Sequence, residues 1–211
     1  MSAIPLIFTS GWASGIDAYA VVLLMGLLGR YAHIGTGAVP PTLERTDVLI
    51  AAGVLFCVQF VVDKIPYLDS ASDIVHTVIR PIAGAAIGAL LAGHAHTLPQ
   101  AAAAALGGGT ALVTHLIKSG VRMGVNTSPE PFSNVIVSLL ENMTVAGLVV
   151  FALLHPVPAA LIAGALLVFG LIAVIFLMSR IRRFWRNRRE RRLARQAGGP
   201  RTRPLRRQPL T

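Results

Sequence analysis

The stretch VPAALIAGALLVFGLIAVIFLM, residues 157–178, carries no charged side chain over a length that can span a lipid bilayer. An α-helix needs about 20 apolar residues to cross a membrane, and within lipid only helices and closed barrels satisfy every backbone hydrogen bond. The rest of the chain has a similar character, because 54% of its 211 residues are hydrophobic and only 13% are charged. The sequence therefore predicts an all-α, polytopic helix bundle in the cell membrane.

Six segments have the length and composition of membrane helices. They are residues 13–29, 46–62, 74–95, 101–119, 135–154 and 157–178. Arginine-rich sequence follows the last segment, and cytoplasmic loops carry an excess of Lys and Arg. With six crossings, both the N- and the C-terminus are expected in the cytoplasm. Arg30 and Arg45 would then flank an outside loop, so segment 13–29 is alternatively re-entrant. The same alternative stays open for segment 70–95.

Basic charge is concentrated at one end of the chain. Of the 19 basic residues, 13 lie between Arg180 and Arg207, although the whole chain has a net charge of +10. We therefore expect a membrane domain at residues 1–179 and a basic, disordered cytoplasmic tail at 180–211. The tail is expected to bind anionic lipid at the cytoplasmic face. Nucleic acid is not an expected partner, because the basic run directly adjoins a membrane segment.

The membrane domain contains signs of an internal repeat, with halves at residues 10–98 and 101–178. The strings GIDAYAVVLLMG and GTALVTHLIKSG, one in each half, both begin and end with glycine. A proline-containing loop follows each string, and an apolar helix follows each loop. Three crossings per half reverse the direction of the second half, so this pattern predicts a 3+3 inverted repeat.

Helix breakers and small residues mark two further features. Pro81 predicts an interruption of the third segment, and Gly107–Gly109 are expected to loosen the fourth. Discontinuous helices of this kind often hold the substrate sites of transporters. Gly84 and Gly88 form a small-xxx-small face that allows close helix contact, either within one chain or in a homodimer.

Ionisable residues share one face of the fourth predicted helix. At 100° per residue, His115, Lys118 and Arg122 fall within about 80° of one another together with the polar Asn126. This cationic face leads into the polar loop NTSPEPFSN near the start of the next helix, which would suit a phosphate or carboxylate. The alternative is that Lys118 and Arg122 snorkel from a helix end. The candidate substrate-binding residues in this part are His115, Lys118, Arg122, Asn126, Ser128, Glu130 and Asn134.

A second ionisable face lies in the string YLDSASDIVHTVIRP. Asp69, Asp73, His76 and Arg80 fall within about 60° of one another on a helix. This face either meets the first one across a polar site or lies in the membrane interface as an amphipathic helix. Asp73, His76 and Arg80 join the substrate-binding candidates.

Other polar residues near membrane depth are candidates for coupling or for structural ion pairs. They are Asp17, Asp63, Lys64, Asp69, Glu141 and Asn142. Because an unpaired charge in lipid is expensive, Glu141 or Asp17 is expected to pair with Lys118 or Arg122. Asp17 alternatively caps its own helix.

Three strings together resemble a known family. The strings are SGIDAYAVVLLMGLLGR, VVDKIPYLDSASDIVHTVIRPIAG and NTSPEPFSN, in this order. They closely resemble the bacterial and plant membrane proteins grouped as domain of unknown function 4126, with similarity over about residues 10–155. The resemblance implies a multi-pass membrane protein without an assigned activity. It also suggests that the second and third strings define the site of the family.

These features favour a small secondary transporter or lipid-carrier translocase for an anionic substrate that bears phosphate or carboxylate. The alternative is a non-transporting membrane scaffold whose Arg-rich tail binds anionic lipid or partners. The sequence contains no Ser-His-acid set, zinc quartet or phosphate loop. An enzyme is therefore not expected, and neither is a cofactor or a metal.

Overall fold

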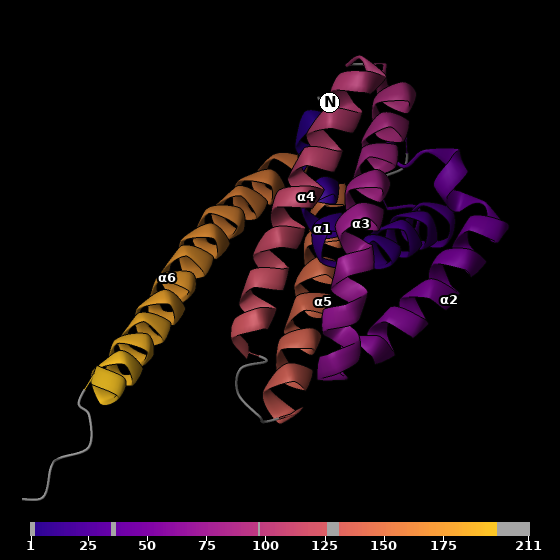
Figure 1. The fold of residues 1–211 in the computed structure, drawn as a ribbon. Helices are drawn as coiled ribbons and strands as arrows, with labels where there is room; N and C mark the ends of the chain where they lie inside the picture. The colour runs from indigo at the N-terminus through magenta and orange to yellow at the C-terminus, as the bar shows by residue number, and fades with distance from the viewer. Residues whose placement is uncertain (1–2, 35–36, 97, 126–130, 198–211) are drawn as a thin grey trace, which may run out of the picture. The chain divides into compact units, whose positions relative to one another are not determined.

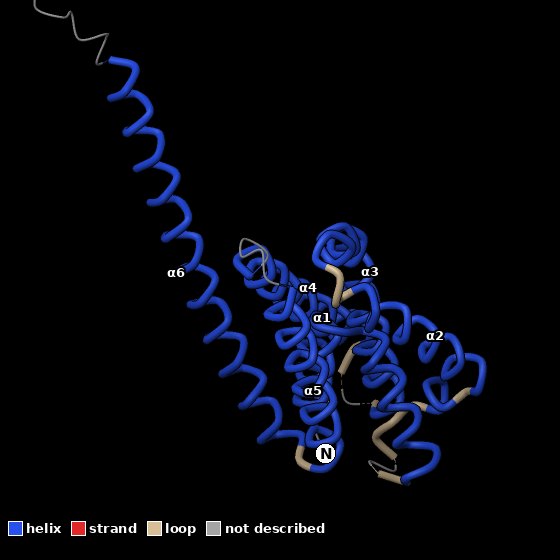
Figure 2. The backbone as a smooth tube through the Cα atoms, turned by 90° about the horizontal axis from the view of Figure 1, so that it is seen from below, coloured by secondary structure: helices blue, strands red, loops and turns tan. Residues whose placement is uncertain are grey.

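The computed structural model describes residues 3–34, 37–96, 98–125 and 131–197, which form helices and loops without a strand among them (Figures 1 and 2). The helices are α1 (Ile4–Leu27), α2 (Thr46–Val62), α3 (Pro66–Ala95), α4 (Gln100–Val125), α5 (Pro131–Leu154) and α6 (Pro156–Ala197). A π-helical turn, Leu28–Ala32, extends α1, and a short 3₁₀ helix, Pro41–Glu44, precedes α2. The predicted all-α class is confirmed.

Five helical segments in the described part of the chain are long and apolar enough to cross a membrane. They are Ile4–Ala32, Ala71–Ala95, Gln100–Met123, Val135–Leu154 and Pro156–Arg180. The sixth expected segment forms α2, an apolar helix of 17 residues at the lower limit of a membrane span. Each half of the chain thus contains three helices, whereas the inverted relation between the halves stays a prediction.

The chain forms two compact units, Met1–Val174 and Ile175–Thr211. The first contains α1 to α5 and the apolar part of α6. In the second, α6 continues through the arginine-rich sequence to Ala197. Residues 180–197 are helical here, in keeping with the helix preference of residues such as Arg and Leu, whereas a disordered tail stays a prediction. Residues 198–211 lie outside the described part.

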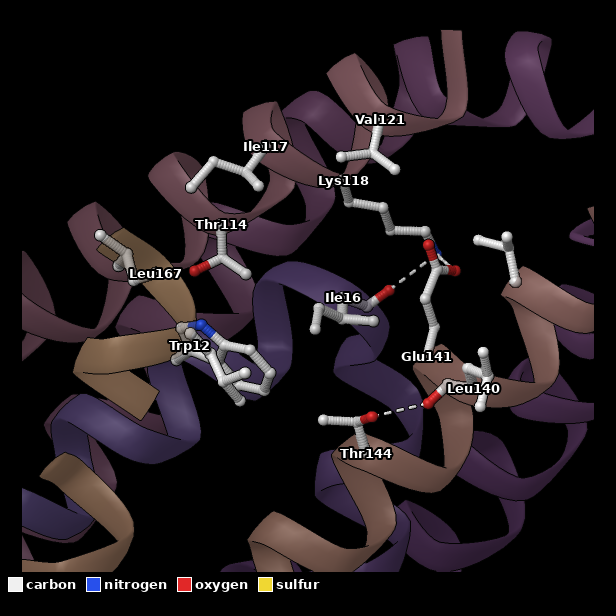
Figure 3. Close-up of a pocket in the computed structure, with 12 residues that line it drawn as sticks. Trp12, Ile16, Thr114, Ile117, Lys118, Val121, Leu140, Glu141, Thr144 and Leu167 are labelled. Carbon is white, nitrogen blue, oxygen red and sulfur yellow. Dashed lines mark hydrogen bonds and ion pairs between the residues drawn. The ribbon is translucent and has the colours of Figure 1, made fainter. Parts of the chain in front are cut away.

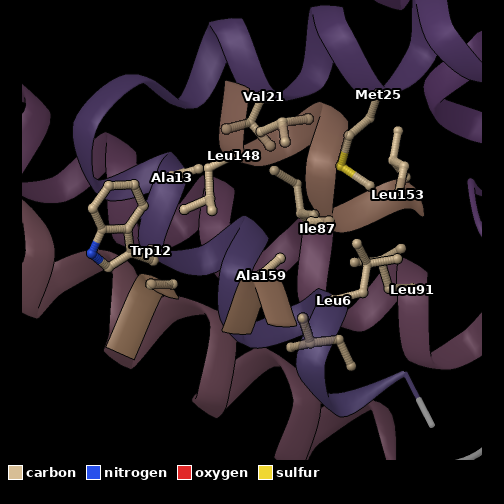
Figure 4. Packing of buried hydrophobic residues seen from close by; sticks show 14 of the residues in the cluster. Leu6, Trp12, Ala13, Val21, Met25, Ile87, Leu91, Leu148, Leu153 and Ala159 are labelled. Carbon is tan, nitrogen blue, oxygen red and sulfur yellow. The ribbon is translucent and has the colours of Figure 1, made fainter. Parts of the chain in front are cut away.

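Helix α1 is the central helix of the first unit. In its most apolar stretch 67% of the residues are buried, compared with 6% in α6. Figure 4 shows Val21 and Met25 of α1 packed among side chains of α3 and α5. The helix begins at Ile4, nine residues before the expected span, with Pro5 in its first turn. The expected span therefore began too late, and the small polar residues Thr9, Ser10 and Ser14 are buried within this helix.

Helices α3 and α4 lie side by side along their length (Figure 1). A Cβ atom on Gly84 would lie 2.8 Å from the carbonyl oxygen of Gly107, and one on Gly88 would meet the carbonyl of Ala103. The small-residue face of α3 therefore packs against α4 within one chain, and a homodimer stays a prediction.

The expected interruption at Pro81 is wrong, since α3 is one helix from Pro66 to Ala95. The lost N–H of a proline is tolerated in membrane helices when neighbouring groups satisfy the backbone. Helix α4 likewise runs through Gly107–Gly109. The break in a membrane helix occurs instead in α1, at Asp17.

Candidate functional site

Asp17 divides α1 into two helical arms. Its backbone is extended, with φ −151° and ψ 97°, and its Oδ1 accepts a 2.9 Å hydrogen bond from the N–H of Ala20. In an unbroken helix this N–H would donate to the carbonyl of Ile16. Asp17 therefore acts as the N-cap of the second arm, which confirms the capping interpretation.

Two basic side chains from other helices bind the carbonyl groups at this break. Lys118 Nζ lies 3.1 Å from the carbonyl oxygen of Ile16, and Arg80 Nη1 lies 3.3 Å from that of Gly15. Helix ends leave carbonyls without an intrahelical partner, and cations are favoured there by the helix dipole. The break in α1 is thus stabilised by α3 and α4.

The two ionisable faces meet at His115, which is fully buried. Its Nδ1 lies 2.7 Å from Arg80 Nη1, and its Nε2 lies 3.0 Å from Thr77 Oγ1 and 3.2 Å from the carbonyl oxygen of Asp73. A guanidinium can only donate, so Nδ1 accepts and Nε2 carries the proton. His115 is therefore neutral in this arrangement.

The ionisable face of α3 is buried within the bundle, where it contacts His115. The side chains of His76 and Arg80 are buried, so the interpretation of this face as an interfacial amphipathic helix is wrong. His76 Nδ1 lies 2.9 Å from Ser72 Oγ, and its ring meets the ring of Tyr19 edge-on. Arg80 also lies 3.7 Å from a carboxylate oxygen of Asp73.

The cations of α4 pair with two carboxylates from other parts of the chain. Lys118 Nζ lies 3.0 Å from Asp63 Oδ2 and 3.4 Å from Glu141 Oε2. Arg122 binds Glu141 through two hydrogen bonds, of 2.6 and 3.1 Å, and donates to the backbone carbonyl of Asp63. The expected pairing of Glu141 with these cations is confirmed. Snorkelling is wrong, because the side chains of Lys118 and Arg122 are only 3% and 1% exposed.

The cluster as a whole is not cationic, contrary to expectation. Its three basic side chains, Arg80, Lys118 and Arg122, lie among the carboxyl groups of Asp17, Asp63, Asp73 and Glu141. Helical periodicity places like charges on one face of one helix, but it does not show which acids from other helices face them. An anion can therefore bind here only when one of the carboxylates gives way.

Asp63 lies in the turn between α2 and α3, outside the candidate spans. Burial alone would raise the pKa of its carboxyl group. The ammonium of Lys118, with the guanidinium groups of Arg80 and Arg122, outweighs burial and holds this pKa below its ordinary value. Asp63 is therefore a permanent counter-ion of Lys118 near neutral pH.

A pocket of about 270 Å³ lies beside the cluster, between α1, α4, α5 and the membrane part of α6. Its walls are mainly apolar. They comprise Trp12, Ile16, Ile117, Val121, Val137, Leu140, Leu166 and Leu167, with the polar residues Thr114, Lys118, Glu141 and Thr144. Figure 3 shows Lys118 and Glu141 at one end of the pocket and Trp12 and Leu167 at the other. The pocket thus joins an apolar space to a buried ion pair.

Several buried polar atoms around the break and the pocket have no hydrogen-bond partner within the described part of the chain. They include Ser14 Oγ, Asp17 Oδ2, His76 Nε2, Arg80 Nε and Thr114 Oγ1. Buried polar groups in proteins are nearly always hydrogen-bonded, so such a group of atoms is typical of a site that receives water or a polar ligand. Thr114 Oγ1 is the one that lines the pocket.

Two of the remaining candidates directly follow residues of the cluster in the sequence, and the side chains of the others are not described. Lys64 donates to the carbonyl of Phe60, 2.8 Å away. Asn142 is half-buried on α5, next to Glu141. Asp69 in α3 and Asn134 in α5 have side chains that are not described, and Asn126, Ser128 and Glu130 lie outside the described residues.

Three residues of the site were not among the candidates predicted from the sequence. Trp12 forms a wall of the pocket, Thr77 contacts His115, and Ser119 donates a 3.0 Å hydrogen bond to Asp73. A signal existed for the last two, because Thr77 follows Asp73 by four residues and Ser119 follows His115 by four, the spacing of one helix face. Trp12 carried no such signal.

Apolar helices of spanning length around a buried cluster of charges define a multi-pass membrane protein. The model of one family, the domain of unknown function DUF4126, matches residues 4–176, and the chain belongs to this family. Comparison with curated proteins finds no match, and comparison with solved structures finds none either.

Proposed function

We propose that the protein is a small membrane transporter or lipid-carrier translocase whose substrate is an amphiphilic anion. The apolar part of the substrate would lie among the apolar wall residues of the pocket, which include Trp12 and Leu140. Its phosphate or carboxylate group would bind Lys118 and Arg122. The observation that carries this proposal is the pocket, which runs from apolar walls to the Lys118–Glu141 pair within membrane-spanning helices.

The head group would supply most of the selectivity. Lipid tails are as apolar as the pocket walls, so moving a chain from the bilayer into the pocket gains little free energy. Hydrogen bonds from Arg and Lys to a carboxylate or phosphate are charge-assisted and strong at low dielectric constant. The hydroxyl of Thr114, which has no partner among the described residues, offers a further hydrogen bond in the same pocket.

The arrangement of the ion pairs favours an anion over a cation. An anionic head group can replace Glu141 as the partner of Arg122 and Lys118, which keeps both cations paired. A cationic head group would have to take Glu141 from both cations and leave them buried without this counter-charge, which is strongly unfavourable.

The break in α1 supports a protein that changes conformation. Broken helices at polar sites are typical of secondary transporters, in which two arms can move separately. The break lies directly beside the pocket, since Ile16 both lines the pocket and provides the carbonyl that Lys118 binds. A catalytic reaction is not part of this proposal, and neither is a cofactor.

The experiment is a flux assay in proteoliposomes. We expect the reconstituted protein to move a single-chain anionic lipid, fluorescently labelled lysophosphatidic acid, between leaflets, and to move lysophosphatidylcholine much less. Thr144→Phe, which fills the pocket, should slow this movement. Met143→Phe is the matched control, because Met143 is 72% exposed on the same helix and does not line the pocket. Equal movement of both lipids, or of neither, would overturn the proposal.

A scaffold function is the second candidate, and the helical arginine-rich part of α6 favours it. Each basic residue near an anionic membrane surface contributes about 1 kcal/mol of binding free energy. Removal of residues 180–211 should abolish a scaffold function but leave lipid flux through the pocket unchanged. Absence of lipid flux, together with binding to anionic vesicles that is lost when the tail is removed, would favour the scaffold.

The orientation proposed for the chain places both termini in the cytoplasm. It requires α2 to cross the membrane despite its 17 residues. In a Cys57→Ser background, which removes the single cysteine, cysteines introduced in place of Ser2 and Thr211 should both resist an impermeant thiol reagent applied to intact cells. Labelling of one but not the other would mean that an odd number of segments cross.

A further inference from the structure

We propose that Glu141 occupies the binding position of the substrate's anionic head group, and that protonation of Glu141 allows the head group to take its place. This inference rests on the proposed function. Each anion that binds would then be accompanied by one proton. This assigns Glu141 as the residue that couples substrate binding to protons.

The geometry of Glu141 is that of a ligand on an arginine. Its two carboxylate oxygens accept hydrogen bonds from Nε and Nη2 of Arg122, at 3.1 and 2.6 Å, and one of them lies 3.4 Å from Lys118 Nζ. The planar fork of a guanidinium binds any carboxylate or phosphate in this side-on manner. A substrate head group that replaced Glu141 would find the same donors.

Glu141 is also the carboxylate that a molecule in the pocket would meet. Its side chain is 15% exposed, whereas those of Lys118 and Arg122 are nearly fully buried beside it. Among the described acidic residues it alone lines the pocket. The Glu141 carboxylate therefore lies between the pocket and Arg122, and it must move away before a substrate can bind there.

Asp63 differs from Glu141 in each of these respects. Its side chain is 4% exposed, it does not line the pocket, and it holds Lys118 at 3.0 Å while its backbone carbonyl accepts from Arg122. Asp63 therefore remains as a fixed counter-ion when Glu141 leaves. The two acids thus have separate roles, one structural and one exchangeable.

The exchange keeps the charges balanced at each end state. With Glu141 ionised, two cations face two carboxylates, Asp63 and Glu141. Protonation of a Glu141 oxygen makes this side chain neutral and leaves one positive charge in excess, which the anionic head group then neutralises. Release of the anion allows the proton to leave and the carboxylate to bind Arg122 again. A buried uncompensated charge, which is strongly unfavourable, is avoided in both states.

Other charged groups around Glu141 are already engaged. The charged groups of α4 that face Glu141 are Lys118 and Arg122. Farther away are the charged groups of the other elements, namely Asp63 in the turn after α2, Asp73 and Arg80 in α3, and Asp17 in α1. Asp73 accepts from Ser119 and lies near Arg80, and Asp17 caps its helical arm. Glu141 is the acid whose partners would be taken over directly by a ligand in the pocket.

The test measures binding of a probe whose own charge does not titrate. A short-chain alkyl sulfonate with a terminal bromine is added to the purified protein in detergent, in a Trp185→Phe background that leaves Trp12 as the single tryptophan. Bromine in the pocket quenches Trp12 fluorescence by contact, since Trp12 is a wall residue. The matching bromoalkyl alcohol measures non-specific quenching.

We expect saturable quenching that strengthens about tenfold for each pH unit of acidification while Glu141 is ionised, the slope of one linked proton. Glu141→Gln, which cannot ionise, should bind the sulfonate tightly at every pH. Asp47→Asn removes an exposed carboxylate paired with Arg45 and should keep the wild-type pH dependence.

A second measurement does not depend on any variant of Glu141. In weakly buffered solution, wild-type protein should take up about one proton for each sulfonate bound. Saturable binding that is independent of pH and takes up no proton would overturn this inference and leave the proposed function standing. Absence of saturable binding at every pH would overturn the proposed function itself.

Discussion

Arg80 donates a 2.7 Å hydrogen bond to Nδ1 of His115 and thereby joins α3 to α4 where both helices are buried. The same nitrogen of Arg80 lies 3.3 Å from the carbonyl of Gly15 at the break in α1. One guanidinium thus connects three helices at the discontinuity. The imidazole of His115 is the acceptor on which this arrangement depends.

Replacement of this acceptor should destabilise the bundle. His115→Ala removes the acceptor for a buried guanidinium, and an unsatisfied buried donor costs about 1–3 kcal/mol of unfolding free energy. His115→Asn can present an amide oxygen near the position of Nδ1 and should lose less. Unfolding in mixed detergent micelles measures both variants. Equal losses for Ala and Asn would mean that packing of the ring, not its hydrogen bond, matters.

The Lys118–Asp63 pair should respond differently to single and double substitutions. Lys118→Met leaves Asp63 buried without its 3.0 Å partner, and breaking one side of a buried ion pair costs about 3–5 kcal/mol. Adding Asp63→Asn removes the stranded charge and should recover a large part of this loss. A double-mutant cycle on unfolding free energies gives the coupling directly. Additive losses would contradict a direct interaction.

The two polar faces of this site were predictable from the spacing of residues along single helices. The positions of Asp73, Arg80, His115 and Lys118 predicted two polar faces because a helix repeats every 3.6 residues, and these faces do meet. The pairing of Lys118 with Asp63 could not be predicted in this way. Asp63 comes from a turn, and periodicity says nothing about which turn faces a given helix.

The position of the helix break was not predictable from helix breakers alone. Pro81 lies inside an unbroken α3, whereas α1 breaks at Asp17. Aspartate is a residue type that also occurs inside helices. What permits the break is tertiary: Arg80 and Lys118 bind the carbonyls that it frees. A break that depends on donors from two other helices leaves only a weak local signal in the sequence.

Stability should fall at acidic pH through Asp63. The pKa of this carboxyl is below its ordinary value in the folded protein, so the folded state favours the ionised form. The resulting stabilisation is fully present above the unfolded pKa of about 4 and is lost as the pH falls through the lower folded pKa. Thermal unfolding in detergent should therefore show a smaller acid-induced decrease in Tm for Asp63→Asn than for the wild type. Parallel pH curves for the two proteins would exclude a role for Asp63.

Two glycines of α4, two positions apart, provide a matched test of the close helix contacts. A Cβ atom on Gly107 would meet the backbone of Gly84 in α3, whereas one on Gly109 would have no heavy atom within 4 Å among the described residues. Alanine favours a helix over glycine by about 1 kcal/mol, so Gly109→Ala should leave stability unchanged or raise it. Gly107→Ala gains the same helix propensity but must push α3 and α4 apart, which weakens packing along both helices. Unfolding free energies in micelles should therefore change in opposite directions. If both variants are stabilised, the contact between Gly84 and Gly107 does not set the distance between the helices.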